Sequence, residues 1–131
     1  MRSWIAVIVL FVACGHGRDR GDFCDDTCVC EQQSVCEGSC GDGCDLACRD
    51  TSTCDVTCED TCTTICERVS SCLVDCGVDC DVTCRDLSSC DVVMISGAVR
   101  CERVSSCNVG CETGNGVVDA VEDPAGVFTC P

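Results

Sequence analysis

Cysteine is the residue type that could do the most chemistry in this sequence. The chain has 131 residues, of which 21 are Cys and only one is His. Thiols in such numbers either bind metal ions or form disulfide bonds. Zinc and iron–sulfur sites favour the spacing Cys-x2-Cys, which does not occur here. The spacing therefore favours disulfides, and no metal site or cofactor is predicted.

Little else in the chain points to catalysis or to an anionic partner. The single His16 lies in a Gly-rich, charged stretch with no nucleophile held beside it, and paired cysteines leave no free thiol. The net charge of −15 excludes nucleic-acid binding, which needs Lys and Arg against phosphate. We therefore expect a protein that is not an enzyme. Its 23 acidic residues leave one alternative open, an exported acidic protein that binds divalent cations such as Ca²⁺.

A repeat of 18 residues organises the cysteines. Within each unit they are spaced 4, 4 and 4 residues apart, and the next unit begins 6 residues later. A fourth unit has Met94 and Ala98 at its second and third positions and is one residue shorter. A fixed period of this length is typical of solenoids. The three complete units are Cys36, Cys40, Cys44 and Cys48; Cys54, Cys58, Cys62 and Cys66; and Cys72, Cys76, Cys80 and Cys84.

The residues between the cysteines predict strands rather than helices. In 54–58 and 80–84, Cys and Val alternate with Asp and Thr, which is the two-residue period of a strand with one buried face. Between strands of this kind lie short turns, two of which, at 41–43 and 77–79, contain turn-forming Gly. Each unit therefore predicts a strand, a bend, a second strand and a third side. The predicted fold is all-β, a small disulfide-stapled β-solenoid resembling a parallel β-helix.

Charges on the predicted third side indicate how the coils stack. If the units lie in register, two neighbouring columns alternate in sign at every coil. Adjacent strands are about 4.8 Å apart, so each charge would lie next to an opposite one and help to specify the register. One column is Arg49, Glu67, Arg85 and Glu102, and the other is Asp50, Arg68, Asp86 and Arg103.

The even number of cysteines missing from the fourth unit suggests how the cysteines pair. The fourth unit lacks its second and third Cys together, as expected if these two bond to each other. The bend between them would bring the two residues close enough for a disulfide. The first and fourth Cys of a unit would then pair, although bonds between neighbouring units would explain the joint loss equally well. The predicted second-to-third pairs are Cys40–Cys44, Cys58–Cys62 and Cys76–Cys80. The predicted first-to-fourth pairs are Cys36–Cys48, Cys54–Cys66, Cys72–Cys84 and Cys90–Cys101.

The first residues predict export. A short positive start is followed by an unbroken apolar run from Trp4 to Ala13, too short to span a bilayer but suited to a signal peptide. Cys14 follows this run directly, and residues 11–15 resemble the lipobox of bacterial lipoproteins, whose Cys is lipidated. Cleavage after Gly15 as an ordinary secretory signal is the alternative. The resemblance implies a membrane anchor at Cys14, with Gly15 favouring the outer membrane.

The C-terminal residues 114–123 resemble the opening of a Cys-rich repeat of secreted myxobacterial-type proteins, in a degenerate form. With the signal and the repeats, the whole chain resembles small Cys-rich lipoproteins of such bacteria, which implies no enzymatic activity. The expected organisation is a signal peptide (1–13), a tether (14–23), a solenoid (24–111) and a cap or tail (112–131). The expected function is a cell-envelope lipoprotein with a structural or adhesive surface role. Its partner at the surface is not identified by the sequence.

Overall fold

The computed structural model describes residues 27–31 and 34–130. The predicted signal peptide, the lipidation site Cys14 and the tether all lie outside these residues. Among the described residues, no helix is long and apolar enough to cross a membrane.

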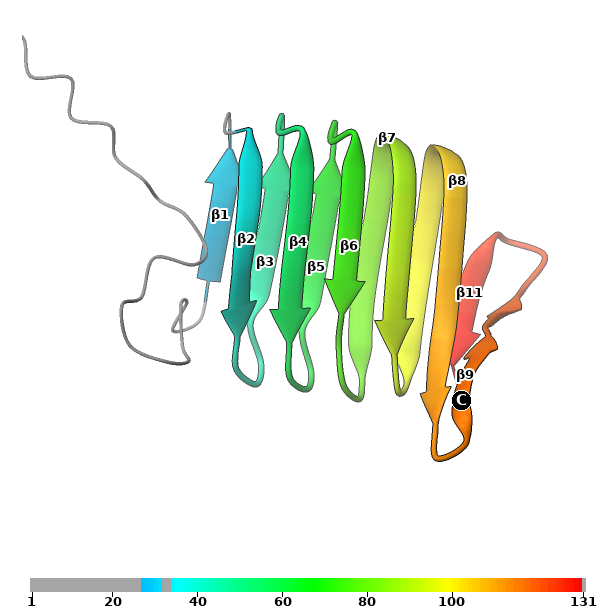
Figure 1. Cartoon of the computed structure of the whole chain (residues 1–131). Coiled ribbons are helices and arrows are strands. Elements are labelled where there is room, and N and C mark those ends of the chain that lie inside the picture. The colour runs from blue at the N-terminus through cyan, green and yellow to red at the C-terminus, as the bar shows by residue number, and fades with distance from the viewer. Residues whose placement is uncertain (1–26, 32–33, 131) are drawn as a thin grey trace, which may run out of the picture.

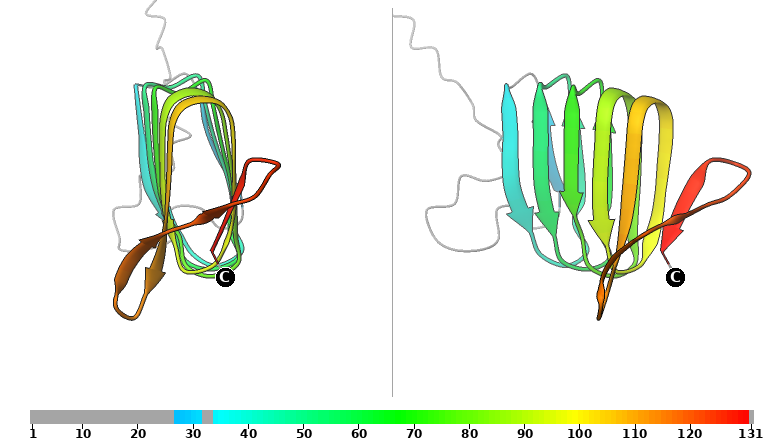
Figure 2. Two further views of the ribbon diagram at one scale, coloured as in Figure 1. Left: turned by 90° about the vertical axis from the view of Figure 1, so that its right-hand side faces the viewer. Right: turned by 45° about the vertical axis from the view of Figure 1, so that its right-hand side comes forward.

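Two parallel sheets lie face to face and are wound from one continuous coil (Figures 1 and 2). Their strands repeat every 18 residues in the first coils, in register, so that Cys48 pairs with Cys66 and Cys36 with Cys54. The prediction of an all-β, disulfide-stapled solenoid is confirmed. The first sheet contains β1 (Thr27–Glu31), β3 (Asp45–Arg49), β5 (Thr63–Glu67) and the beginnings of β7 (Cys80–Met94) and β8 (Gly97–Thr113). The second sheet contains β2 (Val35–Cys40), β4 (Thr53–Cys58), β6 (Ser71–Asp75) and the later parts of β7 and β8.

Each coil has two sides rather than the three that the sequence predicted. The predicted third side is a corner, which β7 and β8 pass without interruption. We call it the wide corner, meaning the five residues between the fourth Cys of one unit and the first Cys of the next, such as 49–53. The narrow corner is the bend between the second and third Cys, such as 41–43. A segment of five residues is too short to form a third sheet and to turn the chain twice.

The alternation of side chains builds a thin core between the sheets. In β4, Cys54, Val56 and Cys58 are buried while Asp55 and Thr57 face outward. This is the two-residue period that the sequence predicted. From the second sheet the core receives Val56, Val74, Val92 and Val109, and from the first sheet Leu46, Thr64, Val82 and Val99.

A small cap follows the last coil. It consists of β9 (Gly116–Asp119), β10 (Val121–Glu122) and β11 (Val127–Cys130). Strand β9 pairs with the end of β8, and β11 pairs with its beginning, both antiparallel. Figure 2 shows the cap crossing the end of the solenoid. The cap therefore occupies part of the free edge that a parallel solenoid would otherwise present to other chains.

Candidate functional site

Disulfides staple the narrow corners as the sequence predicted. The structure joins Cys40 to Cys44, with 6.3 Å between their Cα atoms, and the next two coils repeat this bond. An extended Cys-x3-Cys segment would hold its ends too far apart for a disulfide, so the bend at the narrow corner is what makes the bond geometrically possible. The two equivalent bonds are Cys58–Cys62 and Cys76–Cys80.

The wide corners correct the second part of the predicted pairing. The fourth Cys of a unit bonds to the first Cys of the next unit, not to the first Cys of its own. The coil advances along its axis as it winds, so Cys48 lies nearer in height to Cys54, six residues on, than to Cys36, twelve residues back. The predicted bonds Cys36–Cys48, Cys54–Cys66, Cys72–Cys84 and Cys90–Cys101 are therefore replaced by Cys30–Cys36, Cys48–Cys54, Cys66–Cys72, Cys84–Cys90 and Cys101–Cys107.

The fourth coil shows what happens where a staple is missing. Met94 is fully buried in the place of the second Cys. The third position is occupied by Gly97 and not by Ala98 as the sequence suggested, because Cys80 pairs with Gly97. The deletion thus lies within the narrow corner. A side chain at position 97 would place its Cβ 2.1 Å from the carbonyl oxygen of Cys80, and its φ of 137° also requires glycine.

The cap supplies a staple that sequence analysis missed. Cys111 takes the second-Cys position of the fifth coil, and it bonds to Cys130 of β11. Cys130 lies beside Gly97, in the column of the third Cys. Cysteine parity was the available signal, and a weak one, because apart from Cys14 the predicted pairs also left over Cys24, Cys28, Cys30 and Cys107. The cap therefore completes the pattern of the repeat with a residue from outside it.

The stacked disulfides bring sulfur atoms of successive coils together. The Sγ atoms of Cys48, Cys54 and Cys66 lie within 4.8 Å of one another, as do those of Cys66, Cys72 and Cys84. Three sulfurs at this distance would suit a soft metal ion if they were thiolates. Each of these five cysteines is bonded in a disulfide. These sulfurs are therefore structural, and they form the buried ends of the core.

The first charged column is in the predicted register. Arg49 lies beside Glu67, with 3.4 Å between Nε and Oε2, and Arg85 lies 3.1 Å from Glu102. Glu31 extends the column by one coil, 3.4 Å from Arg49, which the sequence analysis did not include. Glu67 and Arg85 are register neighbours but form no ion pair in the described structure. The oxygen Oε1 of Glu67 accepts a hydrogen bond from the next residue along the chain instead.

The second charged column pairs its members two by two. Arg68 lies 2.6 Å from Asp50 and donates two hydrogen bonds to it, and Arg103 does the same with Asp86. The hydrogen bonds from each guanidinium hold the pKa of its Asp partner below the ordinary value. All four residues have φ near +53°, a left-handed conformation that Arg adopts rarely. Sequence analysis identified these charges but not the conformation that turns them outward at the wide corner.

Comparisons with known proteins give no match, so the candidate functional site is interpreted from its own geometry. The chain matches no protein-family model, no curated protein and no solved structure. The resemblance to lipoproteins of myxobacterial-type bacteria therefore stays a prediction from the sequence.

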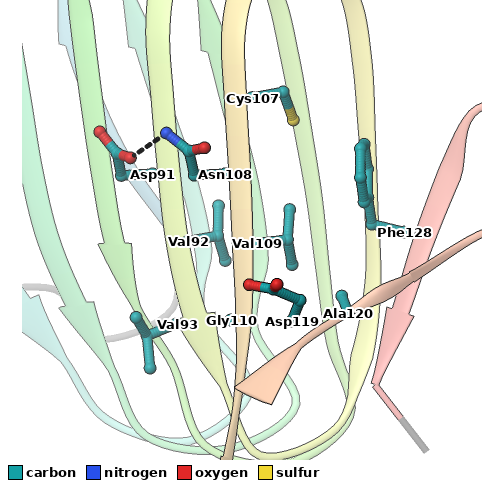
Figure 3. Close-up of a pocket in the computed structure, with 10 residues that line it drawn as sticks. All are labelled: Asp91, Val92, Val93, Cys107, Asn108, Val109, Gly110, Asp119, Ala120 and Phe128. Carbon is teal, nitrogen blue, oxygen red and sulfur yellow. Dashed lines mark hydrogen bonds between the residues drawn. The ribbon is translucent and has the colours of Figure 1, made fainter. Parts of the chain in front are cut away.

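A hollow of about 410 Å³ lies between the last coil and the cap (Figure 3). Val92 and Val109, from the end of the core, line it together with Phe128 of β11, and Asp119 reaches it from β9. Asp91 stands at its edge, where Oδ1 accepts a hydrogen bond from Asn108. The hollow is thus the incompletely covered end of the hydrophobic core, with a carboxylate at its rim.

Proposed function

We propose that this protein is a non-enzymatic component of the bacterial cell envelope, exported and held at the membrane by lipid on Cys14, with a structural or adhesive role at the surface. The observation that carries the proposal is the set of nine disulfides that clip the described solenoid. Disulfides persist in oxidising compartments, and small extracellular domains with thin cores rely on them. A disulfide-rich solenoid of this size is accordingly typical of an extracellular structural protein.

The use of acidic residues at the narrow corners supports a structural role over cation binding. Asp42 accepts a hydrogen bond from the backbone N–H of Asp60, and Asp60 accepts one from that of Val78. Each of these carboxylates therefore bonds the next coil, and it satisfies a backbone donor that strand pairing leaves free. Part of the large negative charge is in this way explained by the architecture itself.

The lipid anchor is proposed from the sequence. Cys14 follows the apolar run directly, and residues 15–23 are rich in Gly and charge, as in a short tether. A single acyl chain holds a protein only marginally, whereas two or three chains anchor it stably. The solenoid would then stand on the membrane as a rigid, anionic body.

The test is the intact mass of the mature protein from its native host. We expect a chain that begins at residue 14 and carries acyl groups. The variant Cys14→Ser is the control, and it should lose the acyl mass and leave the membrane fraction. A free N-terminus at His16 in the unaltered protein would contradict the anchor. Calorimetric titration with Ca²⁺ tests the alternative, because saturable heat at micromolar to millimolar Ca²⁺ would favour a cation-binding protein.

A further inference from the structure

The outer face of the second sheet departs from the repeat at one place. Along the column Glu37, Asp55, Leu73, Asp91 and Asn108, four coils carry a polar or acidic side chain and one carries Leu. In the neighbouring column, Val93 replaces the polar residues of the earlier coils. The side chain of Leu73 is 41% exposed. Two apolar side chains thus lie diagonally in two columns whose other side chains are polar.

The cap enlarges this apolar patch. Strand β9 pairs with the end of β8, which places Val117 next to Gly110 and opposite Glu112. A Cβ atom at Gly110 would come within 2.5 Å of Cγ1 of Val117, so the glycine makes room for the valine. The same position lies near Val93, and Val117 remains 59% exposed. Leu73, Val93 and Val117 line a groove of about 420 Å³ that runs from β4 to β9.

Carboxylates surround the apolar floor of the groove. Asp55, Asp75, Asp91 and Glu112 line it, and none of the cationic side chains that the structure describes does. The carboxylate of Asp91 is held in place by Asn108 and by Ser89, which donate to its two oxygens. The six ion pairs of the described residues involve Arg49, Arg68, Arg85 and Arg103, all at the edge of the wide corner. The described ion pairs therefore leave the acids of the groove without a neutralising partner, and Asp91 among them is also held in place.

We infer that this groove binds a cationic polypeptide segment, in which Arg or Lys side chains flank one or two apolar residues. Asp55 and Asp91 lie on strands two apart, roughly 10 Å, with Leu73 between them. An extended segment can place apolar side chains on the floor while its basic residues reach the carboxylates, and Arg can contact a carboxylate through two hydrogen bonds. The net charge of −15 would speed association with such a partner. The chemistry of the groove indicates which class of partner would serve the adhesive role proposed above. The inference rests on that proposed function only for its biological setting.

Binding is tested with a short synthetic peptide in which two Arg residues flank a single Val on each side, added to the oxidised, exported protein carrying Cys14→Ser so that no lipid is present. We expect saturable binding by fluorescence anisotropy that weakens as salt is raised. The same peptide with Glu in place of Arg should not bind. Equal binding of the two peptides, or none, would overturn the inference and leave the lipid-anchor test unaffected.

The variant Leu73→Asp separates a built groove from a general negative charge. It extends the acidic column at an exposed position, where repulsion from Asp55 and Asp91 should lower stability slightly without unfolding the protein. If the apolar floor matters, the peptide should bind about tenfold more weakly, as the loss of a buried Leu contact implies. Tighter binding would mean that charge alone attracts the peptide, and the groove would have no role.

A matched pair of double variants locates the site. Asp55→Asn with Asp75→Asn removes two charges from the groove and should weaken binding several-fold. Asp45→Asn with Asp81→Asn removes the same charge from the outer face of the first sheet and should change affinity by about twofold at most. Equal effects of the two pairs would contradict the groove as the site. Displacement of the peptide by Ca²⁺ at constant ionic strength would likewise overturn the inference in favour of a cation site.

Discussion

The narrow and wide corners both reverse the direction of the chain, but different interactions stabilise them. At the narrow corner three residues turn the chain, no side chain enters the core, and carboxylates bond the backbone of the next coil, as Asp42 and Asp60 do. At the wide corner five residues turn it, and one of them is directed inward, with Thr51, Val69 and Leu87 buried in successive coils. The wide corner also carries the charged columns. A longer connection loses more conformational entropy on folding. The wide corner is accordingly stabilised by a buried side chain as well as by a disulfide.

The two corners also differ in how far they tolerate the loss of a disulfide. Every wide corner between Cys30 and Cys107 keeps its bond. The fourth narrow corner has lost its bond, and there Met94 fills the core while Gly97 lets the backbone approach Cys80 closely. A two-residue connection between these positions is already so short that a cross-link can restrict it little further. The comparison suggests that the wide corner depends more on its staple.

The largest effect should come from reducing all the disulfides, which removes the staples from both corners. The core is only one layer of small side chains, so burial cannot offset about 1.5 kcal/mol of conformational entropy for each ordered residue. We expect the reduced chain to unfold and its circular dichroism signal for β structure to disappear. A β signal that persists after complete reduction would show that the hydrogen bonds and the core are sufficient by themselves.

The next effect should come from emptying one wide corner. The side chain of Leu87 is 5% exposed, so Leu87→Ala should destabilise the oxidised protein by about 2–5 kcal/mol. The control is Leu73→Ala on the outer face of the second sheet, expected to change stability by about 0.5 kcal/mol at most. Urea denaturation compares the two variants. Equal losses would mean that the wide corner is not part of the packed core.

Removing single disulfides compares the corners directly. We expect Cys66→Ala with Cys72→Ala, at a wide corner, to cost more than Cys76→Ala with Cys80→Ala, at a narrow one. Each loss should fall within about 2–4 kcal/mol, because both bonds close short loops. Denaturant midpoints of the two double variants give the order. If the narrow-corner variant is the less stable of the two, the interpretation of the fourth coil is wrong.

A gain of stability is expected inside the first sheet, away from both corners. The hydroxyl of Thr64 is fully buried and has no hydrogen-bond partner in the described structure, although Val82 and Val99 occupy the same column. Thr64→Val keeps the shape and removes the unpaired polar group, so it should stabilise the protein by about 1 kcal/mol. Thermal unfolding of the oxidised protein measures the gain. Val82→Thr is the reverse control and should destabilise the protein.

The smallest effect should come from the charged columns, since these side chains are exposed and screened by water. Arg68→Glu places a carboxylate against Asp50 and should lower the denaturation midpoint slightly, and adding Asp50→Arg should restore part of the loss. The folded-state pKa of Asp50 is lowered, so the stability it contributes is present above the ordinary carboxyl pKa and is lost as pH falls through the lowered one. The coupling between the two substitutions should therefore disappear in acid. Strict additivity at neutral pH would contradict the contact.

The sequence by itself determined the repeat, the strands and the register. The 18-residue period and the alternation of Cys and Val with Asp and Thr fix which side chains are buried, because a strand has a period of two. The alternating charges placed Arg49 beside Glu67 correctly, since in-register parallel pairing brings equivalent positions together. The bonds across the narrow corner also followed, because they are local and only a bend is needed to form them.

Only the tertiary structure decided how the coil closes. Whether Cys48 bonds forward to Cys54 or back to Cys36 depends on the height of each residue along the solenoid axis, which no local pattern encodes. The cap is a second case, because Cys130 reaches the third-Cys column through antiparallel pairing of β11 with β8. The groove is a third, since Leu73, Val93 and Val117 are separated along the chain and meet only when the coils stack and β9 folds beside them. In each case the deciding contact is between residues of different coils, and it exists only after the chain has wound.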